Sequence, residues 1–71
     1  MATEVQAHIT GTVWKIVTKV GDKVSEGQEI MILESMKMEM PVESTATGTI
    51  KEFKVKEGSA VKEGETVAII E

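Results

Sequence analysis

Residues 11–34 read GTVWKIVTKVGDKVSEGQEIMILE, and residues 48–71 read GTIKEFKVKEGSAVKEGETVAIIE. The two segments align without a gap at an offset of 37 residues, and nine of the 24 positions are identical. Further positions pair one apolar residue with another, as Val13 pairs with Ile50. Self-similarity at a fixed offset is typical of a repeated supersecondary unit. The sequence therefore predicts a fold built from two copies of one unit.

The repeated unit has the character of β-structure. Short runs rich in Val, Ile and Thr are separated by glycines, and no stretch has a helical period with caps. Strands are expected at residues 28–34 and 65–71, each apolar enough to be buried on both faces. An opening strand with one buried face is expected around Val5, Ala7 and Ile9, which alternate with polar residues. The expected turns are Gly21-Asp22, Glu26-Gly27, Gly58-Ser59 and Glu63-Gly64.

Two units that cannot bury their own apolar faces are expected to pack about a two-fold axis. This predicts a single all-β domain over residues 1–71, a flattened barrel or sandwich of two quasi-symmetric four-stranded halves. Residues 34–43 form a hairpin between the halves, and the two-fold axis places it opposite Met1 and Glu71. Ile32 and Ile69 should lie in equivalent strands and be inaccessible to solvent.

Composition narrows the classes of function. The chain has 71 residues, a net charge of −4 and no cysteine, so it has neither disulfides nor thiolate metal ligands. There is no arginine and no basic stripe, which argues against nucleic acid as a partner. No signal peptide or transmembrane segment is evident, so we expect a cytoplasmic protein without a membrane partner. As an isolated domain it is expected to be a monomer.

The hairpin carries the residues that suggest chemistry. Residues 34–39 read ESMKME, which places Lys37 between Met36 and Met38 at or near the turn. A turn holds the lysine amine clear of the fold, where another enzyme can reach it. Acylation needs the neutral amine, whereas a free lysine has a pKa near ~10.4. A partner enzyme must therefore supply both an activated acid and the deprotonation.

The Met-Lys-Met sequence resembles the biotin attachment sequence, (Ala/Ser/Val)-Met-Lys-Met. With the duplicated unit and the G-D-x-V-x-x-G pattern of residues 21–27, the whole chain resembles the biotinyl/lipoyl attachment family. The likeness is strongest to its small stand-alone attachment proteins and to biotin carboxyl carrier domains. Residues 11–21 and 48–58 have equal length, so the chain resembles carrier domains that lack a protruding thumb.

This resemblance implies that a biotin protein ligase attaches biotin covalently to Lys37. The domain then carries carboxyl groups between biotin carboxylase and carboxyltransferase sites of a carboxylase and is not itself an enzyme. By the same resemblance Met36 and Met38 serve recognition, and Glu34 is a possible contact for the ligase. Because Glu71 occupies the position equivalent to Glu34, a structural role for Glu34 remains an alternative.

Other functions remain open. A lipoyl carrier, or an acceptor of both biotin and lipoate, would share the fold and the lysine, although lipoyl domains usually have Asp-Lys-Ala at this place. An unmodified assembly module is a third possibility. A Cu(I) site formed by the sulfur atoms of Met31, Met36, Met38 and Met40 is a fourth. His8 is expected to be a polar strand residue rather than a metal ligand. Trp14 should be partly exposed, because its repeat partner is Lys51.

Overall fold

Short strands separated by turns make up the part of the chain that the computed structural model describes, residues 2–71. The runs rich in Val, Ile and Thr become strands because branched side chains fit a pleated, half-buried surface. The strands are β1 (Thr3–Gln6), β2 (Gly11–Ile16), β3 (Lys23–Val24), β4 (Glu29–Ser35), β5 (Met38–Glu43), β6 (Gly48–Phe53), β7 (Ala60–Val61) and β8 (Thr66–Ile70). In this part of the chain there is no helix long and apolar enough to span a bilayer.

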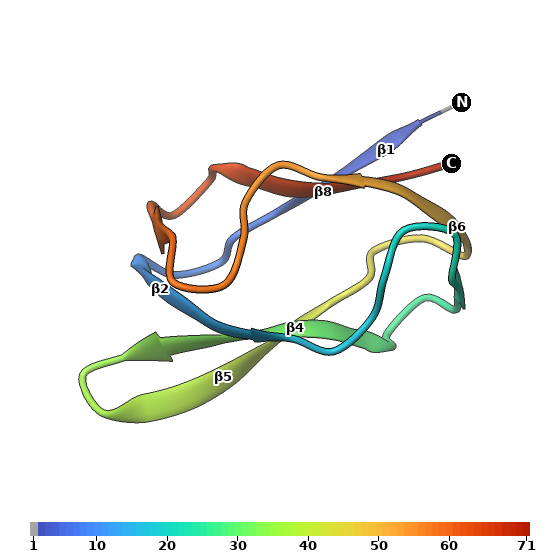
Figure 1. The fold of residues 1–71 in the computed structure, drawn as a ribbon. Coiled ribbons are helices and arrows are strands. Elements are labelled where there is room, and N and C mark those ends of the chain that lie inside the picture. Colours follow the sequence, from blue (N-terminus) through green and yellow to red (C-terminus); the bar gives the residue numbers. More distant parts are fainter. Residues whose placement is uncertain (1) are drawn as a thin grey trace.

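The strands form two four-stranded antiparallel sheets that face each other (Figure 1). The hairpin sheet has the strand order β5-β4-β2-β7, and the terminal sheet has the order β1-β8-β6-β3. Each sheet takes two strands from each half of the sequence, so the halves interleave rather than lie side by side. Neither half can bury its apolar face without the other. The predicted quasi-symmetric, all-β architecture is confirmed.

The strand pairings repeat with the same offset as the sequence. In the terminal sheet β1 pairs with β8 through Thr3 and Ile70, and in the hairpin sheet β5 pairs with β4 through Met40 and Leu33. These are the same pairing at the offset of 37 residues. The repeat therefore extends to β1 and β5, where the sequences of the two halves differ. Among the described residues, 35–37 have no counterpart at this offset, and this unrepeated segment is shorter than the sequence comparison indicates.

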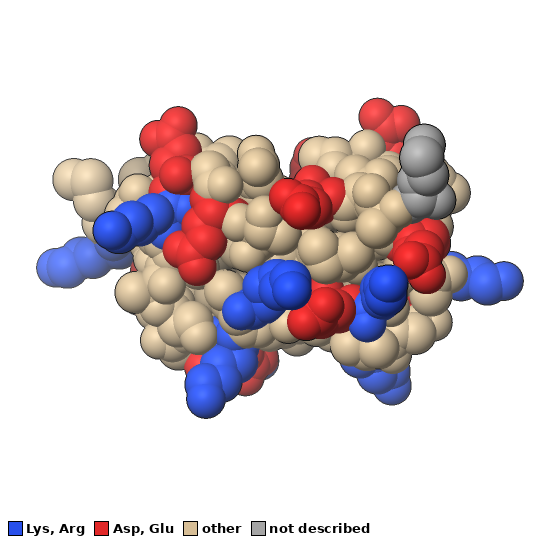
Figure 2. Space-filling model, turned by 90° about the horizontal axis from the view of Figure 1, so that it is seen from above, with Lys and Arg blue, Asp and Glu red and all other residues tan. Residues whose placement is uncertain are grey.

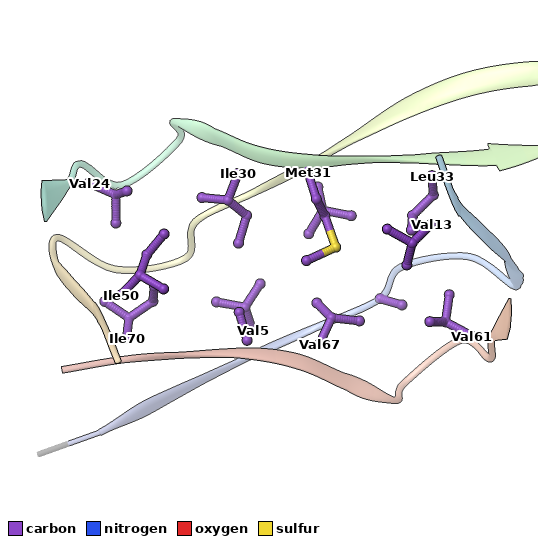
Figure 3. Close-up of a cluster of buried hydrophobic side chains, with 13 residues drawn as sticks. Val5, Val13, Val24, Ile30, Met31, Leu33, Ile50, Val61, Val67 and Ile70 are labelled. Atoms are coloured by element: carbon purple, nitrogen blue, oxygen red, sulfur yellow. The ribbon is translucent and has the colours of Figure 1, made fainter. Parts of the chain in front are cut away.

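The core lies between the sheets and follows the same symmetry (Figure 3). Val24 and Val61 are 3% and 1% exposed, and the equivalent pair Leu33 and Ile70 are 0% and 2% exposed. Full burial of such a side chain contributes roughly 1.5–3 kcal/mol. The buried apolar residues are Val5, Ala7, Val13, Val24, Ile30, Met31, Leu33, Val42, Ile50, Val61, Val67, Ala68 and Ile70.

The prediction that Ile32 and Ile69 are inaccessible is wrong, because both are only half-buried. Ile32 lies opposite Lys15 on one side and Pro41 on the other, on the outer face of the hairpin sheet. Each sheet has one face covered by the other sheet, and no third layer covers the outer faces. The expectation that residues 28–34 and 65–71 are buried on both faces fails for the same reason.

A β-bulge explains why β4 nevertheless has a continuous apolar run. The register of β4 against β5 shifts between Glu29 and Met31, which leaves Ile30 as an extra residue. An extra residue lets two successive side chains point to the same face. Ile30 and Met31 are both fully buried as a result. In the equivalent place of β8, Val67 is the extra residue and is also buried.

The molecule is elongated, with extents of 33 × 18 × 18 Å. The β4–β5 hairpin projects at one end, and the C-terminus lies at the other end beside β1 (Figure 1). The predicted placement of the hairpin opposite the chain ends is thus confirmed for Glu71, whereas Met1 lies outside the described residues. The predicted opening strand is shorter than expected and ends at Gln6, although Ala7 is buried and Ile9 packs against the core.

The predicted turns form as pairs of equivalent structures. Gly21 and Gly58 have φ of 95° and 91°, and Gly27 and Gly64 both have φ of 89°. Glycine adopts positive φ without the steric cost of a β-carbon. Two of these turns form backbone hydrogen bonds to the other half of the chain. The amide of Gly21 donates to the carbonyl of Ile50, and the amide of Gly58 donates to the carbonyl of Val13, both at 2.8 Å.

Candidate functional site

Lys37 lies at the tip of the β4–β5 hairpin. Ser35 and Met38 form the last cross-strand pair, so Met36 and Lys37 alone make the turn. Their φ angles are 53° and 65°, both in the left-handed region. Two-residue hairpins favour positive φ at both positions, because that twist matches the twist of the flanking strands. The hairpin therefore holds the lysine at the position farthest from the core along these strands.

Met36 and Lys37 are not the residue types that a turn with two positive φ angles favours. Asn-Gly is the usual sequence at such a turn, because Asn tolerates and Gly readily adopts positive φ. A residue with a larger side chain in this region costs roughly 1–2 kcal/mol. Met36 and Lys37 therefore contribute strain to the hairpin, which the strand pairing on either side outweighs. Folding alone does not account for these two residues at the tip.

The side chains at the tip are open to solvent. Met36 is 92% exposed and Met38 is 56% exposed, and Lys37 is exposed as well. The ion pairs formed within residues 2–71 do not involve Lys37. Met36 and Met38 thus lie outside the core, whereas Met31 is fully buried in it. An incoming enzyme can reach the lysine amine without displacing any part of the fold.

Glu34 lies at the base of the hairpin, directly opposite Glu39 on β5, and both are exposed. Like charges directly across two strands destabilise the pairing. The repeat partner of Glu34 is Glu71, which forms an ion pair with Lys51 at 3.2 Å. The position equivalent to Lys51 is occupied by Trp14, so Glu34 does not have this partner. If Glu34 has a structural role, it is therefore not the one that Glu71 has in its ion pair with Lys51.

Trp14 is the extra residue of a bulge in β2, where the register against β4 shifts between Val13 and Lys15. Trp14 follows the buried Val13 and is 44% exposed, as predicted. The ammonium group of Lys15 lies 5.8 Å from the ring centroid, within the range of a cation–π contact. Lys51 is the extra residue of the equivalent bulge in β6. The fold therefore does not require an aromatic residue at this position.

Gly11 supports the base of the hairpin, a role that the sequence reasoning missed. A β-carbon at Gly11 would lie 2.5 Å from the carbonyl oxygen of Glu34, which is too close for any side chain. The absence of a side chain lets the start of β2 pass directly against the last residues of β4. Gly48 stands in the same relation to the carbonyl oxygen of Glu71, at 2.7 Å. The identity of these glycines in both halves was the available signal.

His8 is not near the hairpin tip. It is exposed and lines an open hollow of about 430 Å³ at the far end of β5, together with Gln6, Glu26, Glu43 and Thr45. Within residues 2–71 no group of three His, Asp or Glu side chains could hold a metal ion. On the face shown in Figure 2, lysine and acidic side chains are interspersed rather than segregated by sign. The hairpin tip is therefore the candidate site.

A family model described as "Biotin-requiring enzyme" matches residues 1–70. The chain belongs to this biotin/lipoyl family. It is 50% identical over 38 residues to the biotin/lipoyl attachment protein of Bacillus subtilis (strain 168), a match that covers 54% of this chain and 52% of that protein. It is 53% identical over 38 residues to the biotin carboxyl carrier protein of Streptococcus mutans, covering 54% of this chain and 29% of that protein. The chain thus matches about half the length of the first relative and less of the second.

Among solved structures, the urea carboxylase of Kluyveromyces lactis contains a region of the same fold. The superposition has a TM-score of 0.94 and 38% sequence identity, and it covers 100% of this chain but 6% of the carboxylase. The whole fold described above therefore recurs as a small part of a large carboxylase chain. The similarity is to a domain of the biotin carboxyl carrier type.

Proposed function

We propose that Lys37 is an acyl acceptor and that the acid attached to it is biotin. The observation that carries the proposal is the hairpin tip, where an exposed lysine occupies the unrepeated segment of a family fold. The site fits a covalently attached group, because Lys37 is exposed and takes part in neither of the ion pairs formed within residues 2–71. The flanking methionines and the relatives named for biotin favour biotin as the acid.

The reaction at Lys37 is amide formation. A biotin protein ligase presents the acid as its adenylate, and a base of that enzyme takes a proton from the ammonium group of Lys37. The neutral Nζ attacks the acyl carbon, the new C–N bond forms, and the bond to AMP breaks. The nitrogen then loses a second proton to a base of the ligase, which leaves the amide. The chain contributes an amine with open access and a rigid hairpin that holds it. Activation and deprotonation are supplied by the ligase.

The domain then acts as a non-catalytic carrier. Once attached, biotin supplies a ring nitrogen that accepts a carboxyl group at one site and gives it up at another. A tether raises the effective concentration of its group at both sites to the order of millimolar. The 33 Å length of the domain separates the tip from the C-terminus, so a partner can enclose the tip while the other end stays outside. We propose a biotin carboxylase and a carboxyltransferase as the two partners.

A lipoate acceptor is the second candidate, and one observation favours it. The relative from Bacillus subtilis is named a biotin/lipoyl attachment protein. Met36, Lys37 and Met38 are all exposed, so an acid attached at the tip extends into solvent rather than into a pocket of the fold. Selection would then rest with the ligase that recognises Met36, Met38 and Glu34.

The test is the intact mass of the chain after coexpression with a biotin ligase or with a lipoate ligase. We expect one biotinyl group per chain, located at Lys37 by peptide mapping. Lys37→Arg should abolish the added mass, whereas Lys51→Arg, which changes an exposed lysine elsewhere, should leave it unchanged. A biotinyl group that survives Lys37→Arg would disprove the assignment. A lipoyl group without a biotinyl group would establish the second candidate instead.

A further inference from the structure

The methionines of residues 2–71 differ widely in exposure. Met36 and Met38 are 92% and 56% exposed, whereas Met31 is 0% exposed in the core. Met40 is half-buried and lies opposite Leu33, a core residue. Among the methionines of residues 2–71, the two exposed ones are those next to Lys37 in sequence. The tip thus combines the acceptor amine with two methionines that an oxidant in solution can reach.

The backbone gives an independent reason to regard Met36 as functional. Its φ of 53° is unfavourable for a side chain of this size, and glycine or asparagine would fit the turn better. A methionine that is strained and nearly fully exposed contributes nothing to the core. Its apolar, flexible side chain is suited to contact with a partner surface. A change in the polarity of that side chain then changes the contact.

From these observations we propose that peroxide converts Met36 and Met38 to methionine sulfoxides and thereby slows the acylation of Lys37. The hairpin tip would then be a redox-sensitive modification site. This inference rests on the proposed function, because its readout is acylation of Lys37 by a ligase. The oxidant is a hydroperoxide, with hydrogen peroxide as the simplest member of the class.

The chemistry is a two-electron oxygen transfer. A lone pair of the thioether sulfur attacks one oxygen of hydrogen peroxide, the S–O bond forms, and the O–O bond breaks. The departing hydroxide takes the proton from the sulfur-bound oxygen and leaves as water. Sulfur is oxidised and peroxide is reduced, so no further reactant is needed. The product is a polar, chiral side chain that methionine sulfoxide reductases convert back to methionine.

The sulfoxide acts on recognition rather than on the fold. Because Met36 and Met38 are exposed, the added oxygen lies in water and leaves the core packing unchanged. When a ligase covers the tip, that oxygen loses its water and must find a donor in an apolar contact. A loss of this kind is expected to slow acylation about tenfold.

The experiment treats the purified chain with hydrogen peroxide and removes the oxidant with catalase. Biotin ligase, biotin and ATP are then added, and the acylation rate is measured. Peptide mapping should show one added oxygen at Met36 and one at Met38 before any at Met31. The treated chain should be acylated about tenfold more slowly than the untreated chain. Incubation with methionine sulfoxide reductases and a thiol reductant should restore the rate.

Two variants serve as controls, each compared with and without peroxide. Met36→Leu with Met38→Leu keeps apolar side chains of similar volume but has no sulfur at the tip, so its rate should not respond to peroxide. Met40→Leu removes the half-buried sulfur, and its rate should respond as the unaltered chain does. Circular dichroism checks that each variant is folded.

The outcomes separate this inference from the proposed function. A treated chain with sulfoxides at both positions and an unchanged rate overturns the inference and leaves the proposed function standing. The same slowing in the Met36→Leu and Met38→Leu variant also overturns it, because the sensitive group then lies elsewhere. If the untreated chain is not acylated at all, the proposed function fails and the inference fails with it.

Discussion

Met36 and Lys37 have the left-handed backbone that the two-residue turn demands, although neither has a side chain suited to it. At the scale of single residues, this is where local preference and structure disagree. The two strands leading into the turn impose the geometry, because the Ser35–Met38 pair closes the hairpin with only two residues between. Sites at which a sequence gives up local fit are often functional.

The strain at Met36 leads to a prediction about stability. Met36→Asn should raise the free energy of unfolding by up to about 1 kcal/mol, because Asn tolerates positive φ better than Met does. Met36→Ala is the matched control, since it shortens the side chain but still has a β-carbon, and it should be close to neutral. Urea titration measures both variants. A lower stability for the Asn variant would show that Met36 is not strained.

At the scale of elements, the hairpin depends on the close approach of β2 to its neighbour β4 in the same sheet. Gly11 and Glu34 approach so closely that β2 and β4 act as one support for the turn. The equivalent approach of Gly48 to Glu71 lies at the other end of the molecule. The same glycine–carbonyl contact therefore occurs twice, once at the base of the hairpin and once beside the C-terminus. Variants at the two glycines can be compared directly.

Gly11→Ala and Gly48→Ala should each destabilise the fold by roughly 1–3 kcal/mol, because the new β-carbon overlaps a backbone carbonyl. Only Gly11→Ala should also slow acylation of the folded chain, since only its overlap displaces the base of the hairpin. Thermal unfolding gives the stabilities, and ligase assays under conditions where both variants are folded give the rates. Equal acylation rates for the two variants would mean that the hairpin tolerates the displacement.

At the scale of the whole molecule, both repeats contribute side chains to a single core, because their strands interleave in the two sheets. Leu33 and Ile70 occupy equivalent buried positions, and Ile32 and Ile69 occupy equivalent half-buried ones. The contribution of each side chain to the free energy of unfolding should therefore depend on its position in the two-fold arrangement. It should not depend on which half of the sequence the residue belongs to. The stability lost on truncation should differ more between neighbours in one strand, such as Ile32 and Leu33, than between equivalent residues in different sheets, such as Leu33 and Ile70.

Leu33→Ala and Ile70→Ala should each reduce the free energy of unfolding by roughly 2–5 kcal/mol. Ile32→Ala and Ile69→Ala should lose clearly less, roughly 1–2 kcal/mol, because part of each side chain already contacts water. Denaturant unfolding of the four variants measures this. A loss at Ile32 as large as that at Leu33 would indicate that a further layer covers the outer face of the hairpin sheet.

The sequence by itself determined the duplication, the β-strand character and the place of Lys37 on the hairpin between the two halves. These were readable because glycines, branched residues and the Met-Lys-Met segment are local signals, and because two copies can be compared with each other. The partly exposed Trp14 was predictable for the same reason, since Lys51 stands at the equivalent place.

Only the tertiary structure decided how the halves combine. The interleaving of strands from both halves in each sheet depends on pairings between residues far apart in the chain, and no local sequence pattern specifies these pairings. The half-buried state of Ile32 follows from the number of layers, and the burial of both Ile30 and Met31 follows from a bulge set by the partner strand. The left-handed turn at Met36 and Lys37 depends on register as well, because closing the Ser35–Met38 pair leaves only two residues for the turn, and such short turns favour positive φ.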